Sequence, residues 1–284
     1  MSGIYWLASY PKSGNTWLRS FLFNLQQNGA APADINDLST GHIASARNWL
    51  DEVLGFDTAE LDSGEVERLR PAVYRWTLNN SHISYHKIHD ACTLTPDGEH
   101  LVNSEATRGA LYIVRNPLDV AVSAASHWHL SLDETIDCMR QPDMTLARNQ
   151  KGLYDQVPQK LLSWSQHVLS WVNATHLNLQ VIRYEDMLAN PIATFTQAAQ
   201  FLQLPTEPSR IEKAVRFSDF KILSQQEAEK GFKERPMRAE RFFRQGKSGD
   251  WLHKLTSSQV HRILTDHGEV MQRFGYMDDT GNPI

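Results

Sequence analysis

The sequence is poor in cysteine, has no excess of positive charge and contains no long apolar run. Its two cysteines, Cys92 and Cys138, are too few for a disulfide framework, and they show neither CxxC spacing nor a neighbouring histidine cluster. A structural zinc site is therefore not expected. Lysine and arginine total 28 against 33 aspartate and glutamate residues, which gives a net charge of −5. This balance excludes a general nucleic-acid binder, because neutralising phosphates requires a basic excess.

The chain also lacks signals for export and membrane insertion. No apolar run approaches the roughly 18 residues that a membrane span requires, and the N-terminus has no basic region followed by an apolar core and a cleavage site. We therefore expect a cytoplasmic protein without a membrane partner. Its 284 residues, 41% of them apolar, are enough to bury a sizeable core in one large α/β domain or two small ones.

Strand-like and helix-like segments alternate along the chain, which predicts an α/β fold with a mostly parallel central sheet. Short apolar runs predict strands at Ile4–Ser9, Ile83–Ile88, Ala110–Val114 and Leu179–Arg183. Amphipathic runs after three of these strands predict helices at Thr16–Gln27, Leu118–Trp128 and Pro191–Leu202. Asn116 and Asn190 precede Pro117 and Pro191, and this order predicts an N-cap followed by the first helical residue.

Three stretches interrupt the alternation. Gly29–Arg70 and Leu130–Gln159 are less regular, and in an open α/β sheet such insertions lie over the carboxyl ends of the strands, where ligands bind. The third, KGFKERPMRAERFFRQGK from Lys230 to Lys247, holds seven basic residues against two acidic ones. It is either a solvated loop or a lid over an anion, and its composition is compatible with both.

The stretch SYPKSGNTW places a lysine, a glycine and hydroxyl residues where an expected strand is followed by a helix. Free N–H groups and the helix dipole attract anions at such a position. Gly14 lets a phosphate approach the backbone, and Ser13 and Thr16 add hydroxyls. Lys12 adds a full charge, but it precedes the glycine, so the pattern differs from the Walker A form GxxxxGK[ST]. An ordinary strand–helix turn remains the alternative, and Trp17 is either a core residue or a surface for stacking a base.

Two segments together resemble the sulfotransferase family. YPKSGNTW resembles that family's 5′-phosphosulfate loop, usually YPKSGTTW, with Asn15 in place of the commoner threonine. LYIVRNPLDVAVSAASHW resembles its 3′-phosphate segment, in which Arg-x-Pro-x-Asp follows an apolar strand and a serine follows the arginine by eight residues. Arg115 offers a planar fork that suits a phosphate, and Ser123 adds a hydroxyl from the next helix. Asp119 is interpreted as an acidic residue favoured by the helix dipole.

Further segments follow in the family's order. HKIH resembles the KTH segment, with Lys87 and His89 in the matching places, and SWSQHVLSW resembles a WxxHVxxW segment that is interpreted as structural. RYEDMLANP resembles the YEDM segment, whose tyrosine, here Tyr184, contacts adenine.

Two more segments lie toward the C-terminus. SDF resembles an adenine-holding segment whose hydroxyl and aromatic residues are here Ser218 and Phe220. RQGKSGDW resembles RKGxxGDW, which closes over the 3′-phosphate, with Arg244, Gln245 and Gly246 in the matching places. Gln245 replaces a lysine and removes one charge from that grip.

The resemblance extends from Tyr10 to Trp251 and implies a single sulfotransferase domain, residues 1–284, with a sheet flanked by helices in the manner of P-loop NTPases. It implies the donor 3′-phosphoadenosine 5′-phosphosulfate (PAPS) and the product adenosine 3′,5′-bisphosphate (PAP). The acceptor would be a hydroxyl or amine of a small molecule, with a natural product of secondary metabolism as the expected class. No metal is expected, because no carboxylate cluster suggests magnesium.

The resemblance also implies catalytic roles. Lys12, with the N–H groups around Gly14–Thr16, would stabilise the charge that develops on the leaving phosphate. His89 is the candidate general base, because an imidazole can accept a proton near neutral pH, and Lys87 would orient the sulfuryl group. The chain contains other histidines that remain alternatives for the base, namely His82, His86, His127 and His129.

The remaining implied roles concern donor recognition. Trp17 and Phe220 would sandwich the adenine, and Tyr184 would bond its edge. Arg115, Ser123 and the Arg244–Gly246 loop would select the 3′-phosphate and so distinguish PAPS from ATP. A small-molecule kinase or NTPase of related topology is the alternative function, and a non-catalytic nucleotide-binding module ranks below it.

The acceptor site is expected to be covered by the irregular stretches, where the family pattern is weakest. Aromatic residues that could line an apolar pocket are Trp49, Tyr74, Trp76, Tyr85, Trp128 and Tyr154. Acidic residues that could favour a cationic acceptor are Asp51, Glu52, Asp133 and Glu134. Core packing explains most of the aromatic residues equally well, and a solvated face is favoured over an acceptor role for the acidic residues. A monomer and a homodimer both remain open.

Overall fold

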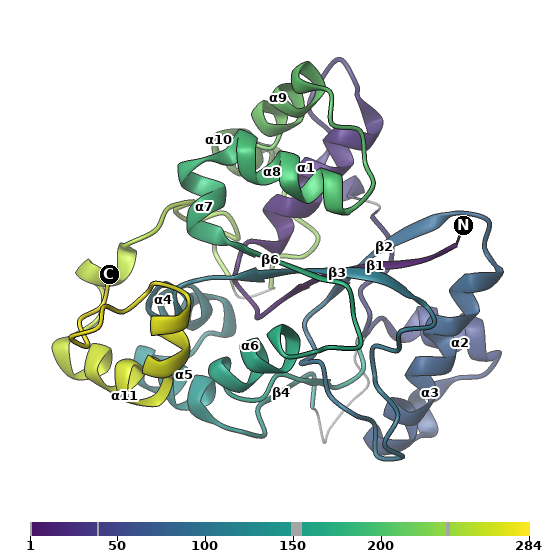
Figure 1. Cartoon of the computed structure of the whole chain (residues 1–284), viewed down its shortest axis with the longest axis horizontal. Coiled ribbons are helices and arrows are strands. Elements are labelled where there is room, and N and C mark those ends of the chain that lie inside the picture. Colours follow the sequence, from purple (N-terminus) through teal and green to yellow (C-terminus); the bar gives the residue numbers. More distant parts are fainter. Residues whose placement is uncertain (1, 39, 149–154, 237–238) are drawn as a thin grey trace. The chain divides into compact units, whose positions relative to one another are not determined.

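The computed structural model describes residues 2–38, 40–148, 155–236 and 239–284 (Figure 1). The described chain forms two compact units. The first comprises Met1–Tyr10, Thr40–Tyr112 and Gln141–Val181, and the second comprises Pro11–Ser39, Ile113–Arg140 and Ile182–Ile284. The single domain expected over residues 1–284 stays a prediction.

A four-stranded sheet with the order β2-β1-β3-β6 organises the first unit. Its strands are β1 (Gly3–Ser9), β2 (Ile83–Ile88), β3 (Thr107–Val114) and β6 (Leu179–Arg183). All four coincide with predicted strands, although β3 begins earlier than expected. Strands β1 and β2 run parallel, with Gly3 opposite Ile83 and Ala8 opposite Ile88. Every residue of β1 is buried, as the unbroken apolar run of a central parallel strand requires.

Helices α2 (Arg47–Leu54), α3 (Ser63–Trp76) and α6 (Trp164–Val172) complete the first unit, with α2 packed beside α3. Capping boxes start two of them: Asp62 with Glu65 at α3, and Ser163 with Gln166 at α6. A short antiparallel pair is formed by β4 (Thr145–Leu146) and β5 (Gln159–Lys160). The stretch expected to be irregular between residues 29 and 70 therefore contains α2 and the start of α3.

The second unit is mainly helical. Its helices are α1 (Asn15–Gln27), α4 (Pro117–Trp128), α5 (Leu132–Arg140), α7 (Tyr184–Ala189), α8 (Pro191–Phe201), α9 (Pro208–Phe217), α10 (Phe220–Lys230) and α11 (Ser257–Arg273). Figure 1 shows α1 beside α9, and α5 beside both α4 and α11. Within the described residues, every helix of the chain is too short or too polar to cross a bilayer.

The predicted proline starts of two helices are both present. Asn116 caps α4, because its side chain accepts a hydrogen bond from the backbone N–H of Leu118, and Pro117 follows at the first helical position. Asn190 precedes Pro191 at the start of α8, but its side chain makes no capping hydrogen bond within the described chain. The α4 cap places Arg115 immediately before the helix.

Candidate active site

A left-handed turn follows β1 and leads into α1. Lys12 has a φ of 68° and Gly14 a φ of 104°, and a non-glycine residue in this region is uncommon outside functional sites. The ring of Tyr184 packs directly on Gly14, so that an added Cβ would lie 2.6 Å from Tyr184 Cδ2. Position 14 therefore requires glycine for its backbone conformation and for the close ring.

The N-terminus of α1 is suited to an anion. Gly14, at the N-cap position, provides no side-chain cap, so the first-turn N–H groups point toward a potential ligand. Ser13 is 1% exposed, and its hydroxyl has no hydrogen-bond partner among the described residues. Burying an unpartnered hydroxyl is costly, and a phosphate or sulfate oxygen beside it would satisfy it. Asn15 and Thr16 are buried next to it.

The Lys12 ammonium lies between two side chains of the second unit. It is 4.1 Å from the centroid of the Phe242 ring, and Lys12 Nζ is 3.5 Å from Nδ1 of His127. Because an ammonium only donates, Nδ1 accepts, which places the proton of a neutral His127 on Nε2. His127 is thus a neighbour of Lys12, a relationship that its position in the sequence did not indicate.

Arg115 connects three segments that were predicted to bind the donor. Its guanidinium donates to the carbonyl oxygen of Lys12 at 2.8 Å and to that of Lys247 at 3.2 Å. The same guanidinium lies 4.2 Å from the centroid of the Tyr184 ring. Its Nε is buried without a hydrogen-bond partner in the described part of the chain. The structure therefore brings Arg115 together with the loop before α1, the start of α7 and the C-terminal basic segment.

Residues Phe242–Trp251, which we call the strap, contain the predicted 3′-phosphate loop. Arg244 donates to the carbonyl oxygen of Val122, the residue before Ser123, at 3.3 Å. Gly246 has a φ of 61°, and a Cβ added there would overlap the ring of Phe220. Arg244 and Gln245 are exposed. The strap thus lies against the predicted phosphate residues of α4 and the predicted adenine residue of α10.

Two acidic residues to which the sequence assigned no donor-site role hold this arrangement. Asp119, interpreted only as a dipole-favoured residue, is 1% exposed and accepts hydrogen bonds from Ser248 Oγ, Gly249 N and Trp251 N in the strap. Glu185 accepts the backbone N–H of Asn116, the residue after Arg115, at 3.0 Å. The interpretation of Asp119 was therefore incomplete, because its partners lie far away in the sequence.

The predicted adenine residues cluster in the second unit. Trp17 meets the ring of Tyr184 edge-on at 5.9 Å between centroids. Trp17 and Phe220 both pack against one apolar cluster, formed by Ile35, Leu223, Phe232 and Phe243. The Ser218 hydroxyl is fully buried and donates to the carbonyl oxygen of Val215 at 3.1 Å. Its role at adenine stays a prediction.

The basic segment that begins at Lys230 is packed rather than freely solvated over its described residues. Glu234 pairs with the buried Arg19 of α1 at 2.6 Å, and Lys230 pairs with Asp34 at 2.7 Å. The backbone N–H of Lys233 donates to the Asn36 side chain at 2.8 Å. These contacts hold the first part of the segment against α1 and residues 34–36, and its role as a lid over an anion stays a prediction. Arg238 of this segment lies outside the described residues.

The predicted base lies in the first unit, just after β2. Nδ1 of His89 donates to the carbonyl oxygen of Ser9 at 2.8 Å. Because a carbonyl only accepts, this bond places the proton on Nδ1 and leaves the basic lone pair of a neutral imidazole on Nε2. That tautomer suits a general base. Lys87 lies on β2, and its carbonyl oxygen accepts from the N–H of Ala44 at 2.8 Å.

His86, an alternative base, is a core residue. It is 4% exposed and stacks on Trp49 at 4.5 Å between ring centroids. Its Nδ1 donates to the carbonyl oxygen of His42 at 3.0 Å, and burial lowers its pKa to about 4. His82 and His129 are exposed. These positions favour His89 among the candidates of the first unit.

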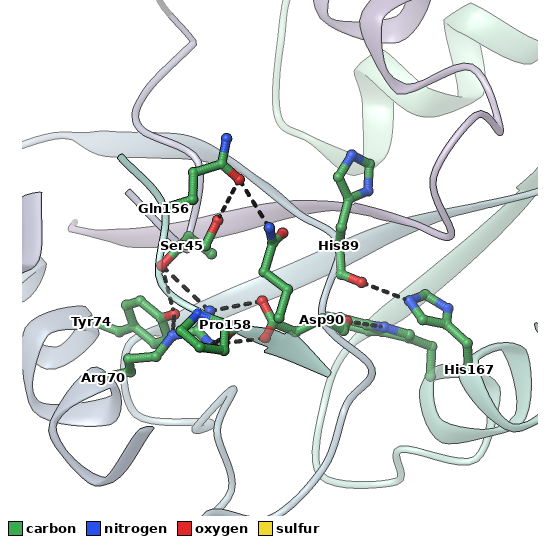
Figure 2. A network of polar contacts seen from close by, with 11 residues as sticks. Ser45, Arg70, Tyr74, His89, Asp90, Gln156, Pro158 and His167 are labelled. Atoms are coloured by element: carbon green, nitrogen blue, oxygen red, sulfur yellow. Dashed lines mark hydrogen bonds and ion pairs between the residues drawn. The ribbon is translucent and has the colours of Figure 1, made fainter. Parts of the chain in front are cut away.

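A buried polar network holds the backbone of His89 and Asp90 (Figure 2). Nε2 of His167 donates to the carbonyl oxygen of His89 at 3.0 Å, and the hydroxyl of Tyr112 donates to His167 Nδ1 at 2.8 Å. Burial lowers the pKa of His167 to about 4 and keeps it neutral. Arg70 forks onto both carboxylate oxygens of Asp90 at 2.8 and 2.7 Å. The SWSQHVLSW segment, predicted to be structural, thus supports the loop that carries His89.

The structure places several of the residues proposed for acceptor binding in the core, at the surface or in an ion pair. Tyr74 is fully buried, and its hydroxyl donates to the carbonyl oxygen of Ala44 at 3.0 Å, whereas Trp76 is 58% exposed. Asp133 pairs with Arg262 at 2.7 Å. Tyr154 lies outside the described residues. Among the described residues no group of three or more histidine, cysteine, aspartate or glutamate side chains could hold a metal ion.

An α/β fold in which a glycine-containing turn and an uncapped helix N-terminus follow the first strand is typical of P-loop-like folds. Comparison with known proteins gives the particular class. Residues 4–275 match the family model described as "Sulfotransferase domain", and the chain belongs to the sulfotransferase family. It is an enzyme of that class, and the predicted family and fold class are confirmed.

Relatives support this membership across nearly the whole chain. Sulfotransferase 2A6 of Rattus norvegicus is 25% identical over 272 residues, which cover 94% of this chain and 84% of that protein. A crystal structure of a mouse sulfotransferase complexed with PAP has a TM-score of 0.61 and 20% identity, covering 98% of this chain and 86% of that chain. A retinol dehydratase in a complex with retinol and PAP also has a TM-score of 0.61, at 17% identity, covering 95% and 81%.

Proposed function

We propose that the protein transfers a sulfuryl group from PAPS to a hydroxyl or amine of a small-molecule acceptor, a natural product of secondary metabolism. One observation carries the donor assignment. Within the second unit, the turn before α1, Arg115 and the strap converge, and they bring cations and helix N–H groups together. A nucleotide with phosphate groups at its 3′ and 5′ positions would present one anionic group to the turn and another to Arg115 and the strap.

The 5′ end of the donor would occupy the turn before α1. The buried, unpartnered Ser13 hydroxyl and the uncapped helix N-terminus support this placement. Gly14, Asn15 and Thr16 would supply further backbone and side-chain contacts. Lys12 would stabilise the charge that develops on the leaving phosphate oxygen, as preorganised cations do in group transfer.

The nucleoside and 3′-phosphate would lie against the remaining donor residues. Trp17 and Phe220 would hold the adenine with Tyr184 at its edge, and Ser218 would act from the turn before α10. The phosphate residues would be Arg115, Ser123, Arg244, Gln245 and Gly246. Arg115 supports this role, because its guanidinium already joins the two loops that flank the site.

His89 would accept the acceptor's proton at Nε2, since its Nδ1 is engaged with the Ser9 carbonyl. Lys87 would orient the sulfuryl group. When bound, PAPS supplies the sulfuryl group and its bisphosphate is the leaving group. The neighbouring retinol dehydratase is complexed with retinol and PAP, which supports a small-molecule acceptor for this chain. A cytoplasmic location, a monomer or homodimer, independence from metals and the absence of nucleic-acid and membrane partners stay predictions.

Differential ligand stabilisation tests the proposal. Thermal unfolding is measured with PAP and, separately, with ATP plus magnesium. A ligand at 100 times its Kd stabilises the folded state by about 2.7 kcal/mol, so PAP should raise the Tm clearly. A rise with ATP plus magnesium alone would overturn the proposal in favour of a kinase or NTPase.

A further inference from the structure

The two ends of the strap, Phe242–Trp251, are each held by a buried carboxylate. Neither carboxylate belongs to the proposed donor contacts. At the C-terminal end the carboxylate is Asp119, in the first turn of α4. At the N-terminal end it is Glu227, in the last turns of α10.

Asp119 binds three donors of the strap. Its Oδ2 accepts from Ser248 Oγ at 3.0 Å and from Gly249 N at 2.8 Å, and its Oδ1 accepts from Trp251 N at 3.2 Å. The residue is 1% exposed. A buried carboxylate is stable only when hydrogen bonds replace its hydration, so the strap supplies what Asp119 needs. The bonds tie the end of the strap to the helix that carries Ser123.

Glu227 holds the other end of the strap through both of its carboxylate oxygens. Its Oε1 accepts from the backbone N–H of Phe242 at 2.7 Å, and its Oε2 accepts from that of Phe243 at 2.8 Å. Glu227 is 6% exposed, and the Phe243 ring is buried in the cluster with Leu223 and Phe232. The start of the strap is therefore held by two charge-assisted hydrogen bonds and by apolar packing.

Phe242 links this anchor to the reactive end of the donor site. Its backbone is held by Glu227, and its ring lies 4.1 Å from the Lys12 ammonium and meets His127 edge-on at 5.9 Å between centroids. Phe242, whose backbone Glu227 holds, is therefore one of the side chains that contact the Lys12 ammonium, together with His127. The exposed residues between the anchors, Arg244, Gln245 and Lys247, have their positions set from both sides.

We infer that Asp119 and Glu227 are positioning residues, and that each acts at a different end of the bound nucleotide. Asp119 sets the part that faces the 3′-phosphate, and Glu227, through Phe242, sets Lys12 at the 5′ end. This inference rests on the proposed donor site. A purely architectural role would lower stability without distinguishing one end of the nucleotide from the other.

Calorimetric titration with PAP and with adenosine 5′-monophosphate (AMP) separates the two ends, because AMP lacks the 3′-phosphate. Asp119→Asn keeps the size of the side chain but replaces one acceptor oxygen. We expect this variant to lower the affinity for PAP about tenfold, equivalent to about 1.4 kcal/mol, and to leave the affinity for AMP unchanged. Asp266→Asn, an exposed position on α11, is the matched control and should change neither.

Glu227→Gln should behave differently. The variant should weaken the binding of PAP and of AMP by the same factor, several-fold, because both ligands carry the 5′-phosphate that Lys12 would contact. In a Lys12→Ala background the effect of Glu227→Gln should disappear, since the residue would act through Lys12. Glu229→Gln, an exposed residue of the same helix, is the control.

The outcomes distinguish the inference from the proposed function. If the unaltered protein binds PAP no better than AMP, the donor site itself is wrong. Suppose that the unaltered protein prefers PAP to AMP. The inference is overturned if Asp119→Asn retains the full preference for PAP, or if Glu227→Gln weakens ligand binding by the same factor in the Lys12→Ala background as in the unaltered protein. Should Asp119→Asn fail to fold, Ser248→Ala removes one of the same hydrogen bonds without stranding a charge, and an unchanged preference for PAP over AMP in that variant would also refute it.

Discussion

Gly14→Ala tests the geometry of the turn before α1 most directly. The backbone conformation there, with φ at 104°, is one that L-residues rarely adopt, and a left-handed conformation costs about 1–2 kcal/mol for a residue with a Cβ. The new methyl would also lie 2.6 Å from Tyr184 Cδ2. Displacing a packed ring costs about 1–3 kcal/mol, so the free energy of unfolding should fall by about 2–5 kcal/mol.

The Tyr184 ring cannot move alone, because the Arg115 guanidinium stacks on it at 4.2 Å. Gly14→Ala should therefore weaken PAP binding as well as stability. If the shift of Arg115 costs the free energy of one hydrogen bond, the Kd for PAP should rise at least about tenfold. Each kcal/mol lowers the Tm by about 2–4 °C in a domain of roughly this size, which predicts a fall of about 4 °C or more by calorimetry.

Gly55→Ala is the matched control for Gly14→Ala. Gly55 has a φ of 77°, and no atom lies within 4 Å of an added Cβ, so that variant meets the backbone cost without the ring contact. It should lose about 1–2 kcal/mol of stability and retain PAP affinity. If Gly14→Ala is as stable as Gly55→Ala and binds PAP as tightly as the unaltered protein, the packing of Tyr184 on Gly14 is wrong.

Other variants address individual roles. Lys12→Ala should abolish transfer from labelled PAPS, and measurable turnover near the original rate would contradict the leaving-group role. Arg115→Ala should raise the Kd for PAP more than it alters acceptor preference in a panel of phenols, sugars and amines. His89→Ala should lower turnover about 10²-fold or more while PAP still binds; near-normal turnover with a weakly acidic acceptor would refute the base assignment. Burial lowers the pKa of His167 to about 4. Between about pH 6.5 and 4 this imidazole is therefore protonated in the unfolded chain but stays neutral in the folded chain. Stability should therefore fall as the pH drops from about 6.5 toward 4, by up to roughly 1.4 kcal/mol per pH unit, and urea unfolding of His167→Gln should show a shallower fall.

The strands and their following helices could be predicted because each carries its own local signal. Apolar runs mark β1, β2 and β6, and an asparagine followed by a proline marks the start of α4. β3 begins at Thr107, earlier than the apolar run, because its first residues are only half buried and include a polar Thr-Arg pair. The start of helix α3 falls in a stretch expected to be irregular, although Asp62 and Glu65 form a capping box that the sequence displays. Pro71 lies inside that helix, where proline is disfavoured.

The candidate site was predictable where a motif is local and not where partners are distant. The residues from Lys12 to Trp17 are contiguous, so their joint role could be expected. Asp119 could not be understood alone, because its donors lie 129 to 132 residues later in the chain. Glu227 carries no motif at all, and its role depends on a strap 15 residues downstream folding back onto α10.

The choice between His86 and His89 shows how a local rule and a distant contact combine. Side chains alternate between the two faces of a strand, so His86 and Ile88 share one face of β2, and both are buried. Lys87 and His89 have the opposite parity and are only half buried, but Tyr85 shares that parity and is buried, so the observed burial of His86, and not the alternation, favours His89 as a group that can reach a substrate. The sequence does not reveal which nitrogen of His89 is basic. That depends on the Ser9 carbonyl at the end of β1, which accepts from Nδ1, and β1 lies beside β2 in the sheet. The parallel pairing of β1 with β2 therefore determines the tautomer, and a shift in the register of these two strands would remove the bond that leaves Nε2 as the basic nitrogen.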